Sequence, residues 1–573
     1  MRRLHNDPVD FADEMIDGFV AANSAQVRRV SGGVIRNTAS NPDAVALVIG
    51  GGSGHYPAFG GLVGQGLAHG AAMGNIFASP PAQHVHSVAS RAALGGGVLL
   101  VYGNYAGDVL NFDQAQKQLI SEGIDCRSVV VTDDVASAPI TEKHKRRGIA
   151  GDLCVFKVAA AASDAGYSLD EVVRVAALAN ERTRSFGVAF TGCTLPGADA
   201  PLFTIPEGRM GVGVGIHGEP GIDETDVPSA DGLASLLVEK LLADLPEGVA
   251  HAKGARASAI LNGLGAVKYE ELFVVYRRVA QLLGEVGVTV IEPEVGELVT
   301  SFDMGGVSLT LFWLDEELEK FWGAPADSPA YRKGSIGAVQ TLPETLAAKE
   351  VTAVIAPSTP ESRAAAAIAL QALNAISTVV NENVQELGRI DAVAGDGDHG
   401  IGMQRGATAA LGAAKNALAA EAGAQSLLEI AADSWAERAG GTSGALWRVA
   451  LRAVAASLGN TEQPRSCDVV AGVLAARDGI LTFGATVGDK TMIDALVPFA
   501  ETLEQRVGAG SSLAEAWAEA AEVTAAAAAA TADMLPKVGR ARPHAENSLG
   551  TPDAGAHSLA LIVQCISAVL AGE

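Results

Sequence analysis

The stretch AVALVIGGGSGHYPAFGGLVGQG, residues 44–66, decides the fold class of the first half of the chain. Its first six residues, 44–49, are all apolar, which is typical of a buried β-strand, and the glycines that follow predict a tight turn at the end of that strand. A dinucleotide-binding loop of the form GxGxxG would need glycine where Pro57 stands. We therefore expect a buried strand and glycine turn of an α/β domain without a dinucleotide fingerprint.

The same alternation of strand, turn and helix continues through the first half of the chain. Short β-rich runs followed by turn residues cover residues 97–102, 128–132, 188–191 and 288–291. Helical patterns lie between such runs, for example at residues 151–165, and another precedes them at residues 11–22. This order of elements predicts an α/β domain.

The pattern changes after about residue 358. Residues 361–387 form one long amphipathic helical stretch, which Thr359 and Pro360 open and Gly388 stops. Alanine-rich periodic segments continue to the end of the sequence without a convincing strand. We expect an α/β domain over residues 1–330, a proline-rich linker over 331–358 and an all-α domain over 359–573.

The composition is that of a folded, acidic chain. Of the 573 residues, 48% are hydrophobic, and the formal net charge is −25. Such a charge repels phosphate backbones and anionic lipid, so we expect no nucleic-acid partner and no membrane association. The first residues lack an apolar signal segment, no apolar run reaches about 18 residues, and the five cysteines form no CxxC pair. These features favour a reducing cytoplasm.

The sharpest cluster of charged residues is DAVAGDGDHG, residues 391–400. Three carboxylates, Asp391, Asp396 and Asp398, lie within eight residues, and the glycines on both sides of Asp396 let the backbone bring them together. Hard oxygen ligands of this kind suit Mg²⁺. An acidic surface turn explains the same residues without a metal, so the spacing alone leaves both interpretations open.

Two further segments contain candidate phosphate contacts. GGTSGALW, residues 440–447, lies between two helical patterns, where free N–H groups at a helix start would bind phosphate, although a loop between packed helices is an equal explanation. Residues 539–556 place Arg540 and an acidic turn before the last helical pattern. The dipeptide Gly-Lys is absent from the sequence, so any bound nucleotide is not held by a Walker A loop.

Three polar residues lie beside glycines in turns of the first half, His55, Asp108 and His217. Two histidines and an aspartate suit the roles of nucleophile, general base and orienting donor. Structural turn histidines and an ordinary helix-capping aspartate account for the same residues, so their pattern does not choose between the two interpretations.

Taken in order, these motifs resemble the dihydroxyacetone kinase family. GGGSGH at 50–55, NYAGDVLNF at 104–112 and GVGIHGEPG at 213–221 look like its ketose-binding domain. DAVAGDGDHG at 391–400, GGTSGA at 440–445, GDKTMIDAL at 488–496 and the segment 539–556 resemble its ATP-binding domain. The resemblance covers nearly the whole chain.

For the first domain, the resemblance implies an α/β fold that holds a short ketose covalently, as a hemiaminal between a nitrogen of His217 and the substrate carbonyl. His55 and Asp108 match the residues that hydrogen-bond the ketose and deprotonate its terminal hydroxyl. Further substrate contacts are implied at Gly52, Ser53, Gly54 and Gly103.

For the second domain, the resemblance implies a barrel of antiparallel helices that binds ATP. Asp391, Asp396 and Asp398 match the ligands of two Mg²⁺ ions. The implied nucleotide contacts are His399, Gly400, Ile401, Gly402, Thr442, Ser443, Gly484, Thr491, Met492, Arg540, Asp553, Ala554 and Gly555. Family members dimerise with the ketose domain of one chain facing the ATP domain of the other, and the same homodimer is expected here.

The chain departs from the family pattern around the ketose. Tyr56, Phe59, Gln65 and Gly103 stand where the family has glutamate, histidine, lysine and lysine. The last of these lysines reaches the substrate in the family, so Gly103 removes a donor and opens space. We therefore expect ATP-dependent phosphorylation of a terminal hydroxyl of a short-chain ketose, with D- or L-erythrulose favoured and dihydroxyacetone next.

Three other functions stay open. One is a phosphocarrier-dependent dihydroxyacetone phosphotransferase, which the fused chain disfavours. Another is FAD-AMP lyase (cyclising) activity, a side reaction in some relatives. The last is a non-catalytic sugar-binding regulator, which the three retained aspartates disfavour.

Overall fold

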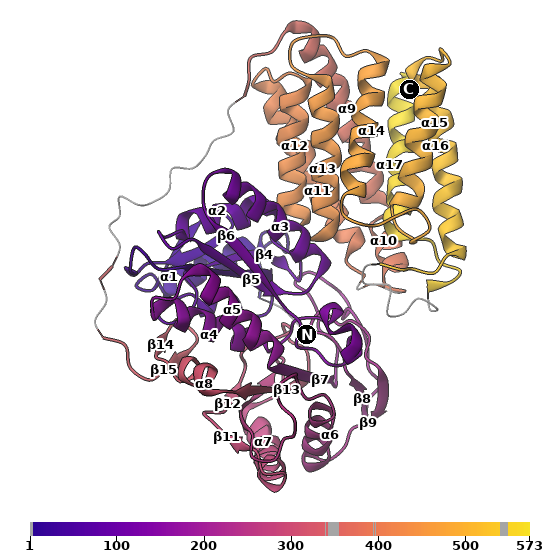
Figure 1. The fold of residues 1–573 in the computed structure, drawn as a ribbon. Helices are drawn as coiled ribbons and strands as arrows, with labels where there is room; N and C mark the ends of the chain where they lie inside the picture. Colours follow the sequence, from indigo (N-terminus) through magenta and orange to yellow (C-terminus); the bar gives the residue numbers. More distant parts are fainter. Residues whose placement is uncertain are drawn as a thin grey trace. The chain divides into compact units, whose positions relative to one another are not determined.

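Strand β3 (Ala46–Ser53) lies inside a six-stranded sheet and is buried along its whole length (Figure 1). The strand order in this first sheet is β1-β2-β4-β3-β5-β6. Its other strands are β1 (Val27–Val30), β2 (Gly33–Arg36), β4 (Gly70–Ile76), β5 (Val98–Gly103) and β6 (Cys126–Val131). Strands β4, β3, β5 and β6 run parallel, so their carboxyl ends, where open α/β sheets bind ligands, meet at one edge.

The second large sheet of the chain has seven strands. Its order is β11-β10-β13-β7-β8-β9, and β12 pairs with β10. The strands are β7 (Thr183–Ala189), β8 (Arg209–Val212), β9 (Asp223–Asp226), β10 (Arg256–Gly263), β11 (Thr289–Val290), β12 (Glu294–Gly296) and β13 (Gly306–Leu314). Four predicted strands overlap observed ones: 97–102 with β5, 128–132 with β6, 188–191 with β7 and 288–291 with β11. Strands β10 and β13 were not predicted from the sequence.

The computed structural model describes residues 4–337, 340–341, 355–393, 395, 397–538 and 548–572. The chain divides into two compact units, residues 1–349 and 350–573, and each is described by itself. The helices of the first unit are α1 (Phe11–Ala22), α2 (Ala82–Ala92), α3 (Ala106–Ser121), α4 (Asp152–Asp164), α5 (Leu169–Glu181), α6 (Ala230–Leu242), α7 (Tyr269–Glu285) and α8 (Glu316–Trp322). Helices α2 and α3 cover one face of the first sheet, and α6 and α7 pack on the second sheet.

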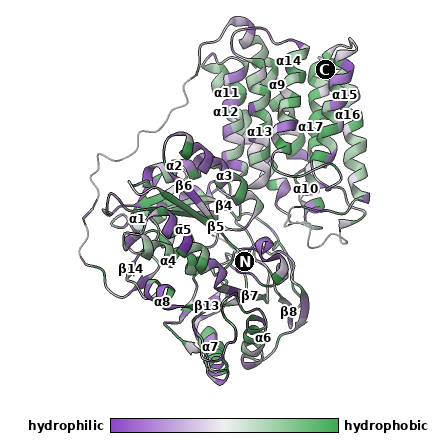
Figure 2. Cartoon of the chain, in the orientation of Figure 1, coloured by the Kyte–Doolittle hydropathy of each residue, from purple (hydrophilic) through white to green (hydrophobic). Residues whose placement is uncertain are grey.

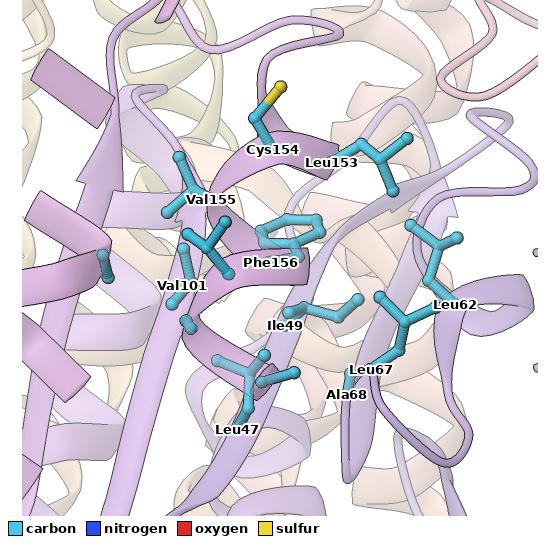
Figure 3. Packing of buried hydrophobic residues seen from close by; sticks show 14 of the residues in the cluster. Leu47, Ile49, Leu62, Leu67, Ala68, Val101, Leu153, Cys154, Val155 and Phe156 are labelled. Atoms are coloured by element: carbon cyan, nitrogen blue, oxygen red, sulfur yellow. The ribbon is translucent and has the colours of Figure 1, made fainter. Parts of the chain in front are cut away.

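Helix α4 forms the centre of the largest core in the first unit. Each of its residues from 152 to 163 is buried, and a helix that is apolar on all sides belongs in an interior. Figure 3 shows Phe156 and Val155 of this helix packed against Leu47, Ile49 and Val101 from β3 and β5. Burial of each such large side chain stabilises the fold by roughly 1.5–3 kcal/mol. Figure 2 shows the corresponding strands as a largely hydrophobic band.

The described contacts of the first unit continue past residue 330. Tyr331 is buried in the same core as α4, and β15 (Arg332–Lys333) pairs with β14 (Ala326–Asp327). The Gln340 carbonyl accepts a hydrogen bond from the Ala39 N–H. Part of the predicted linker, residues 342–354 and 338–339, lies outside the described residues.

The second unit is helical throughout its described residues. Its helices are α9 (Pro360–Glu382), α10 (Val384–Asp391), α11 (His399–Ala419), α12 (Ala424–Ala439), α13 (Gly441–Leu458), α14 (Ser466–Leu481), α15 (Ile493–Gly508), α16 (Leu513–Ala530) and α17 (Ala554–Ala571). From α11 onward each helix packs against the next, and both α11 and α17 pack against α9 (Figure 1). Trp435, Phe499 and Trp517 lie in the common core among many small alanines.

The single helix predicted over 361–387 is two helices. Its start agrees with the prediction, because the Thr359 hydroxyl caps the Ser362 N–H and Pro360 is the first helical residue. Asn383 separates α9 from α10 with φ −110° and ψ 10°, and its side-chain amide donates to the Val379 carbonyl. A short polar side chain that bonds the preceding turn competes with the helical backbone, which explains the break.

Two helices of the second unit, α9 and α17, are long and apolar enough to cross a membrane by length and composition alone. Neither helix is an unbroken apolar run, because Arg363 and Gln371 lie within α9 and His557 and Gln564 lie within α17. The two helices pack against each other, and Leu373 and Ile376 of α9 and Leu559 and Ile562 of α17 belong to the core of the helical unit. Their apolar side chains are thus used, at least in part, in packing between helices.

Candidate functional site

The imidazole rings of His55 and His217 face each other at the carboxyl edge of the first sheet. His55 follows the end of β3 after Gly54, whose φ of +100° favours glycine. His55 Nε2 lies 3.0 Å from His217 Nε2, and both residues are buried, with 2% and 6% of their surface exposed. The two histidines that the sequence analysis considered separately therefore form one pair.

The His55 ring is held on both sides. Its Nδ1 donates to the Thr300 carbonyl oxygen over 2.7 Å, and its face stacks on Phe77 with ring centroids 5.0 Å apart. Burial lowers the pKa of His55 to about 3, with a further contribution from His217, so the ring is neutral at physiological pH. Tyr105 packs against His217, with its ring perpendicular to the imidazole and the two ring centroids 4.6 Å apart.

The other nitrogen of His217 points to a carboxylate. Glu219 Oε1 accepts from His217 Nδ1 over 3.0 Å, and Glu219 Oε2 accepts from the His217 backbone N–H over 3.0 Å. Arg147 lies behind Glu219, with Nη1 3.8 Å from Oε2, and pairs with the buried Asp134 at 2.8 Å. A hydrogen-bonded carboxylate fixes which nitrogen of an imidazole carries the proton.

Asp108 lies in the first turn of α3, which follows β5 directly. It is buried, with 8% of its surface exposed. The loop before it is anchored by Asn104, whose amide donates to the Arg146 carbonyl over 2.7 Å, and by Tyr105, whose hydroxyl donates to the Gly148 carbonyl over 2.9 Å. Because β5 runs parallel to β3, Asp108 and His55 follow strand ends at the same edge of the sheet.

The small residues predicted around the ketose have distinct surroundings. A Cβ on Gly52 would lie 2.7 Å from the Ala78 backbone nitrogen, so only glycine fits there. The Ser53 hydroxyl donates to the Gly74 carbonyl over 2.6 Å. A Cβ on Gly103 would lie 3.2 Å from the Tyr105 ring, so much of the space expected beside Gly103 is occupied by that ring.

A second buried carboxyl, Asp152, lies near Asp108 and was not foreseen. It is the first residue of α4, is 2% exposed, and its Oδ1 has no hydrogen-bond partner in the described structure. Burial raises the pKa of Asp152 well above its usual range, and the charges of Asp133 and Asp108 act in the same direction. The surroundings of Asp152 therefore disfavour its ionised form.

In the second unit, the acidic turn joins α10 to α11. Asp391 is the last residue of α10 and Asp398 immediately precedes α11, while Asp396 lies outside the described residues. A Cβ on Gly395 would lie 2.5 Å from Asp391 Oδ1, and Gly397 has φ +78°, so this turn requires both glycines. Burial, followed by the charge of Asp391, raises the pKa of Asp398 to about 7.

The donor set of this turn fits a divalent cation. Asp391 and Asp398 provide hard carboxylate oxygens, and their mutual repulsion is what a bound Mg²⁺ would relieve. Within the described residues, no group of three His, Cys, Asp or Glu side chains is arranged to hold a metal ion. The third predicted ligand, Asp396, is not among those residues.

His399 brings the starts of three helices together. Its Nε2 lies 3.0 Å from Ser558 Oγ in the first turns of α17, and its Nδ1 lies 3.3 Å from Ser443 Oγ in the first turn of α13. Its own backbone N–H donates to Asp391 Oδ2 over 3.4 Å. Helix starts present free N–H groups and positive dipole ends, which is a favourable environment for phosphate.

Asp553, Gly555 and Met492 form the neighbouring part of this end of the unit. Asp553 caps α17 by accepting from the Ala556 N–H over 2.7 Å, and burial, with the charges of Asp391 and Asp494, raises its pKa to about 7. A Cβ on Gly555 would lie 3.4 Å from Met492 Cβ, so the α15 and α17 starts are close. The Thr491 N–H donates to Asp494 Oδ2 over 2.8 Å.

The remaining predicted nucleotide contacts are spread over the same helix starts. Gly400, Ile401 and Gly402 are in the first turn of α11, Thr442 in that of α13, and Ala554 in that of α17. Gly484 follows α14 with φ +92° and has no described contact with these residues. Arg540 lies outside the described residues.

Several residues that build the sites were missed by the sequence analysis. Glu219 and Lys490 were visible inside the quoted motifs but received no role. Arg147, Asp134 and Thr300 come from separate loops, and no local pattern marks them. Lys490 is buried and its Nζ donates to the Ser548 carbonyl over 2.7 Å and to the Met534 carbonyl over 3.2 Å.

Comparisons with known proteins agree with this two-part arrangement. The Dak1 domain matches residues 17–330 and the DAK2 domain matches residues 393–568. An L-erythrulose kinase of Pectobacterium atrosepticum is 60% identical over 571 residues, covering 100% of this chain and 97% of the relative. A D-erythrulose kinase of Mycolicibacterium smegmatis is 54% identical over 586 residues, covering 100% of both.

Among solved structures, the dihydroxyacetone kinase from C. freundii in complex with AMP-PNP and Mg²⁺ is similar, with a TM-score of 0.53, 28% sequence identity and 99% of each chain covered. The resemblance seen in the sequence motifs is therefore confirmed. The chain belongs to the dihydroxyacetone kinase family, with an N-terminal α/β domain followed by a C-terminal helical domain.

Proposed function

We propose that this protein is an ATP-dependent kinase that phosphorylates a terminal hydroxyl of a short-chain ketose, with D- or L-erythrulose favoured and dihydroxyacetone next. The observation that carries the proposal is the buried His55–His217 pair, which offers a nucleophilic nitrogen to a carbonyl carbon in a chain that also has a carboxylate turn at helix starts. The names of the two erythrulose kinases support the four-carbon substrate.

In the first domain, His217 Nε2 adds to the substrate carbonyl and holds the ketose as a hemiaminal. Its orientation follows from Nδ1, which is occupied by Glu219. His55 Nε2 lies within hydrogen-bond distance of His217 Nε2, and we propose that Asp108, at the same sheet edge, removes the proton of the terminal hydroxyl. Addition to a carbonyl selects ketones and aldehydes over polyols such as glycerol.

The missing donor at Gly103 supports a substrate other than dihydroxyacetone, whereas the space beside Gly103 does not, because the Tyr105 ring fills much of it. Glycine removes the donor that the family has at this position, and the Tyr105 ring lies beside it. Gly52, Ser53 and Gly54 complete the proposed substrate contacts at the end of β3.

In the second domain, we propose a closed barrel of helices that binds ATP at its helix starts. Asp391, Asp396 and Asp398 would hold two Mg²⁺ ions, which neutralise phosphate charge when bound. The backbone N–H groups at the starts of α11, α13 and α17 are suited to the phosphates, and His399 keeps these starts together. Thr491, Met492, Arg540 and Asp553 are proposed as further nucleotide contacts.

The wider setting is also proposed. The linker lies within residues 331–358 and after Thr341, because Gln340 and Thr341 still pair with Ala39 and Thr38. The protein acts as a cytoplasmic homodimer in which the ketose domain of one chain faces the ATP domain of the other. Its partners are the ketose and ATP, without nucleic acid or membrane.

A coupled ADP-release assay tests the function directly. The substrates are D- and L-erythrulose, dihydroxyacetone, glyceraldehyde and glycerol, each with ATP and Mg²⁺ as the complete mixture. We expect the highest kcat/KM with one erythrulose enantiomer and no turnover of glycerol. Equal rates with glycerol would contradict carbonyl addition, and no turnover of any ketose with ATP alone would contradict the kinase assignment.

A further inference from the structure

A chain of ionic contacts leads from Asp134 through Arg147 and Glu219 to His217. Arg147 donates from Nε to Asp134 Oδ2 over 2.9 Å and approaches Glu219 Oε2 with Nη1 at 3.8 Å. Glu219 then accepts from both the ring Nδ1 and the backbone N–H of His217. The side chains are largely removed from solvent, with 2%, 15%, 12% and 7% of Asp134, Arg147, Glu219 and His217 exposed.

The loop is shaped around this chain. A Cβ on Gly215 would lie 2.1 Å from Glu219 Oε2 and 2.5 Å from Arg147 Nη1. Glycine at this position therefore leaves room for the carboxylate and the guanidinium to approach each other. The glycines of GVGIHGEPG serve the contact between Glu219 and Arg147 as well as the turn itself.

The hydrogen bonds count the protons on the two imidazoles. The Thr300 carbonyl only accepts, so His55 Nδ1 carries a proton, and the Glu219 carboxylate only accepts, so His217 Nδ1 carries one. The two Nε2 atoms are 3.0 Å apart, and a hydrogen bond between them requires a third proton. Three protons on two rings make one positive charge, which Glu219 opposes, while Arg147 is opposed by Asp134.

The charge of the pair is the same before and after carbonyl addition. Once the shared proton lies on His55 Nε2, the Nε2 lone pair of His217 forms the new C–N bond, the π electrons of the carbonyl move to its oxygen, and that oxygen takes the proton from His55. The product ring has carbon on Nε2 and hydrogen on Nδ1, so it keeps one positive charge. With a neutral side chain at position 219 the free pair can release its third proton and become neutral, whereas the adduct, with carbon on Nε2 and hydrogen on Nδ1, stays a buried cation without a counter-charge. A carboxylate at this position therefore stabilises the adduct relative to the free pair.

We propose that Glu219, held by Arg147 and Asp134, is a positioning residue that fixes the proton on His217 Nδ1 and balances the charge of the hemiaminal. This inference rests on the proposed function, because it assumes that His217 adds to the ketose. The pKa of His55, which burial lowers to about 3, agrees with it, since a protonated His55 readily passes its proton to the carbonyl oxygen. Glu219 acts through His217 and contacts neither the ketose carbonyl nor ATP.

The test measures the adduct itself by ¹³C NMR, without ATP. Dihydroxyacetone and erythrulose, each labelled with ¹³C at the carbonyl carbon, are added to the full-length wild type and to the Glu219→Gln, Glu219→Asp and His217→Ala variants. Glu224→Gln is the matched control, because Glu224 is an exposed glutamate whose partner is Arg209. We expect the wild type and the control to convert the bound carbonyl signal to that of a saturated carbon.

For Glu219→Gln we expect at least a 10-fold smaller adduct population and a similar loss in kcat/KM for the ketose, with KM for ATP unchanged. Glu219→Asp keeps the negative charge and should restore part of the adduct population. It also provides a second measurement if the Glu219→Gln variant is too unstable to assay. An adduct in Glu219→Gln equal to that of the wild type overturns this inference alone. Absence of adduct in the wild type overturns the hemiaminal mechanism itself. Failure of the Glu219 proposal and failure of the proposed mechanism therefore give different results.

Discussion

His55 Nε2 lies 3.0 Å from His217 Nε2, although the two residues are 162 positions apart in the chain. The contact joins the loop after β3 to the loop that contains Glu219, and it is shielded from solvent on both sides. The two buried imidazoles have their outer nitrogens anchored to Thr300 and Glu219, which would preorganise them for the carbonyl addition that we propose. The predictions below test the roles of individual residues around this pair and in the helical domain.

Removal of the Asp108 carboxylate should slow the chemical step without preventing substrate capture. We expect Asp108→Ala to lower kcat by roughly 100-fold or more, as for loss of a general base, while the ¹³C adduct on His217 persists. Steady-state kinetics and NMR on the same variant give both readouts. Asp113→Ala, on the exposed side of the same helix, is the control, and unchanged turnover in Asp108→Ala would remove its assignment as the base.

His217→Ala should affect selection of the substrate more than the phosphoryl transfer step. We expect a higher KM for the ketose and a smaller ratio of ketose to glycerol turnover, because carbonyl addition no longer contributes to binding. The same assay on Asp108→Ala should show the opposite division between KM and kcat. If the ketose KM of His217→Ala equals that of the wild type, covalent capture plays no part in binding.

The free energy of unfolding of the first domain should decrease in mild acid because of His55, so the domain becomes less stable. Its pKa is about 3 in the folded protein, whereas an unfolded imidazole takes up a proton near pH 6.5. The contribution of neutral His55 to the free energy of unfolding is complete above pH 6.5. It is lost progressively as the pH falls from 6.5 toward 3, with a slope of about 1.4 kcal/mol per pH unit. Denaturant unfolding at several pH values measures it, and His55→Gln should flatten the slope by one proton.

Asp152→Asn should stabilise the first domain at neutral pH. The pKa of Asp152 is raised, so the folded state disfavours its ionised form, and stability is lost as the pH rises from the unfolded value near 3.9 through the folded one. We expect a gain of about 1–3 kcal/mol at pH 7, since the buried carboxyl lacks a partner for Oδ1.

The gain from Asp152→Asn should vanish near pH 4, where both states of the wild type are protonated. Thermal and denaturant unfolding across this pH range provide the measurement. The control is Asp170→Asn on the exposed first turn of α5, which should bring no such gain. A gain that is independent of pH would show that charge at position 152 is not the cause.

Lys490→Met should destabilise the helical domain and weaken ATP binding together. The Lys490 ammonium is buried and links the Met534 carbonyl to the carbonyl and hydroxyl of Ser548, so its loss removes three hydrogen bonds from a charged group at a cost of roughly 2–4 kcal/mol. Thr491 and Met492 follow it directly in the chain. Lys537→Met, at an exposed lysine, is the control, and an unchanged melting temperature and KM for ATP would refute this role.

The proposed ketose site of the first unit and the proposed metal site of the second unit should respond separately to loss of the metal. EDTA, Asp391→Ala and Asp398→Ala should each lower turnover by about 100-fold or more, yet leave the ¹³C adduct on His217 intact. Glu386→Ala, at an exposed glutamate of α10, serves as the control. Turnover that survives both EDTA and the aspartate variants would contradict the metal assignment.

Much of the fold could be read from local patterns. The apolar run before the glycines of residues 50–54 predicts β3, and the caps at Thr359 and Pro360 predict the start of α9, because these signals act within one turn or one strand. The break at Asn383 was not predicted, because the helical periodicity continues across it. Strands β10 and β13 were not predicted either, because they depend on burial between neighbouring strands. The positions of His55, His217 and the aspartates were likewise visible as residues beside glycine turns.

The sequence by itself determined the two fold classes, the order of the motifs and the turns that need glycine, because periodicity, capping and positive φ are properties of neighbouring residues. Only the tertiary structure decided which of those residues meet. The contacts of His217 with His55 and Glu219, of Glu219 with Arg147, and of His399 with Ser443 and Ser558 depend on where strand ends and helix starts converge in space. That convergence is set by packing of distant segments, which no local pattern encodes.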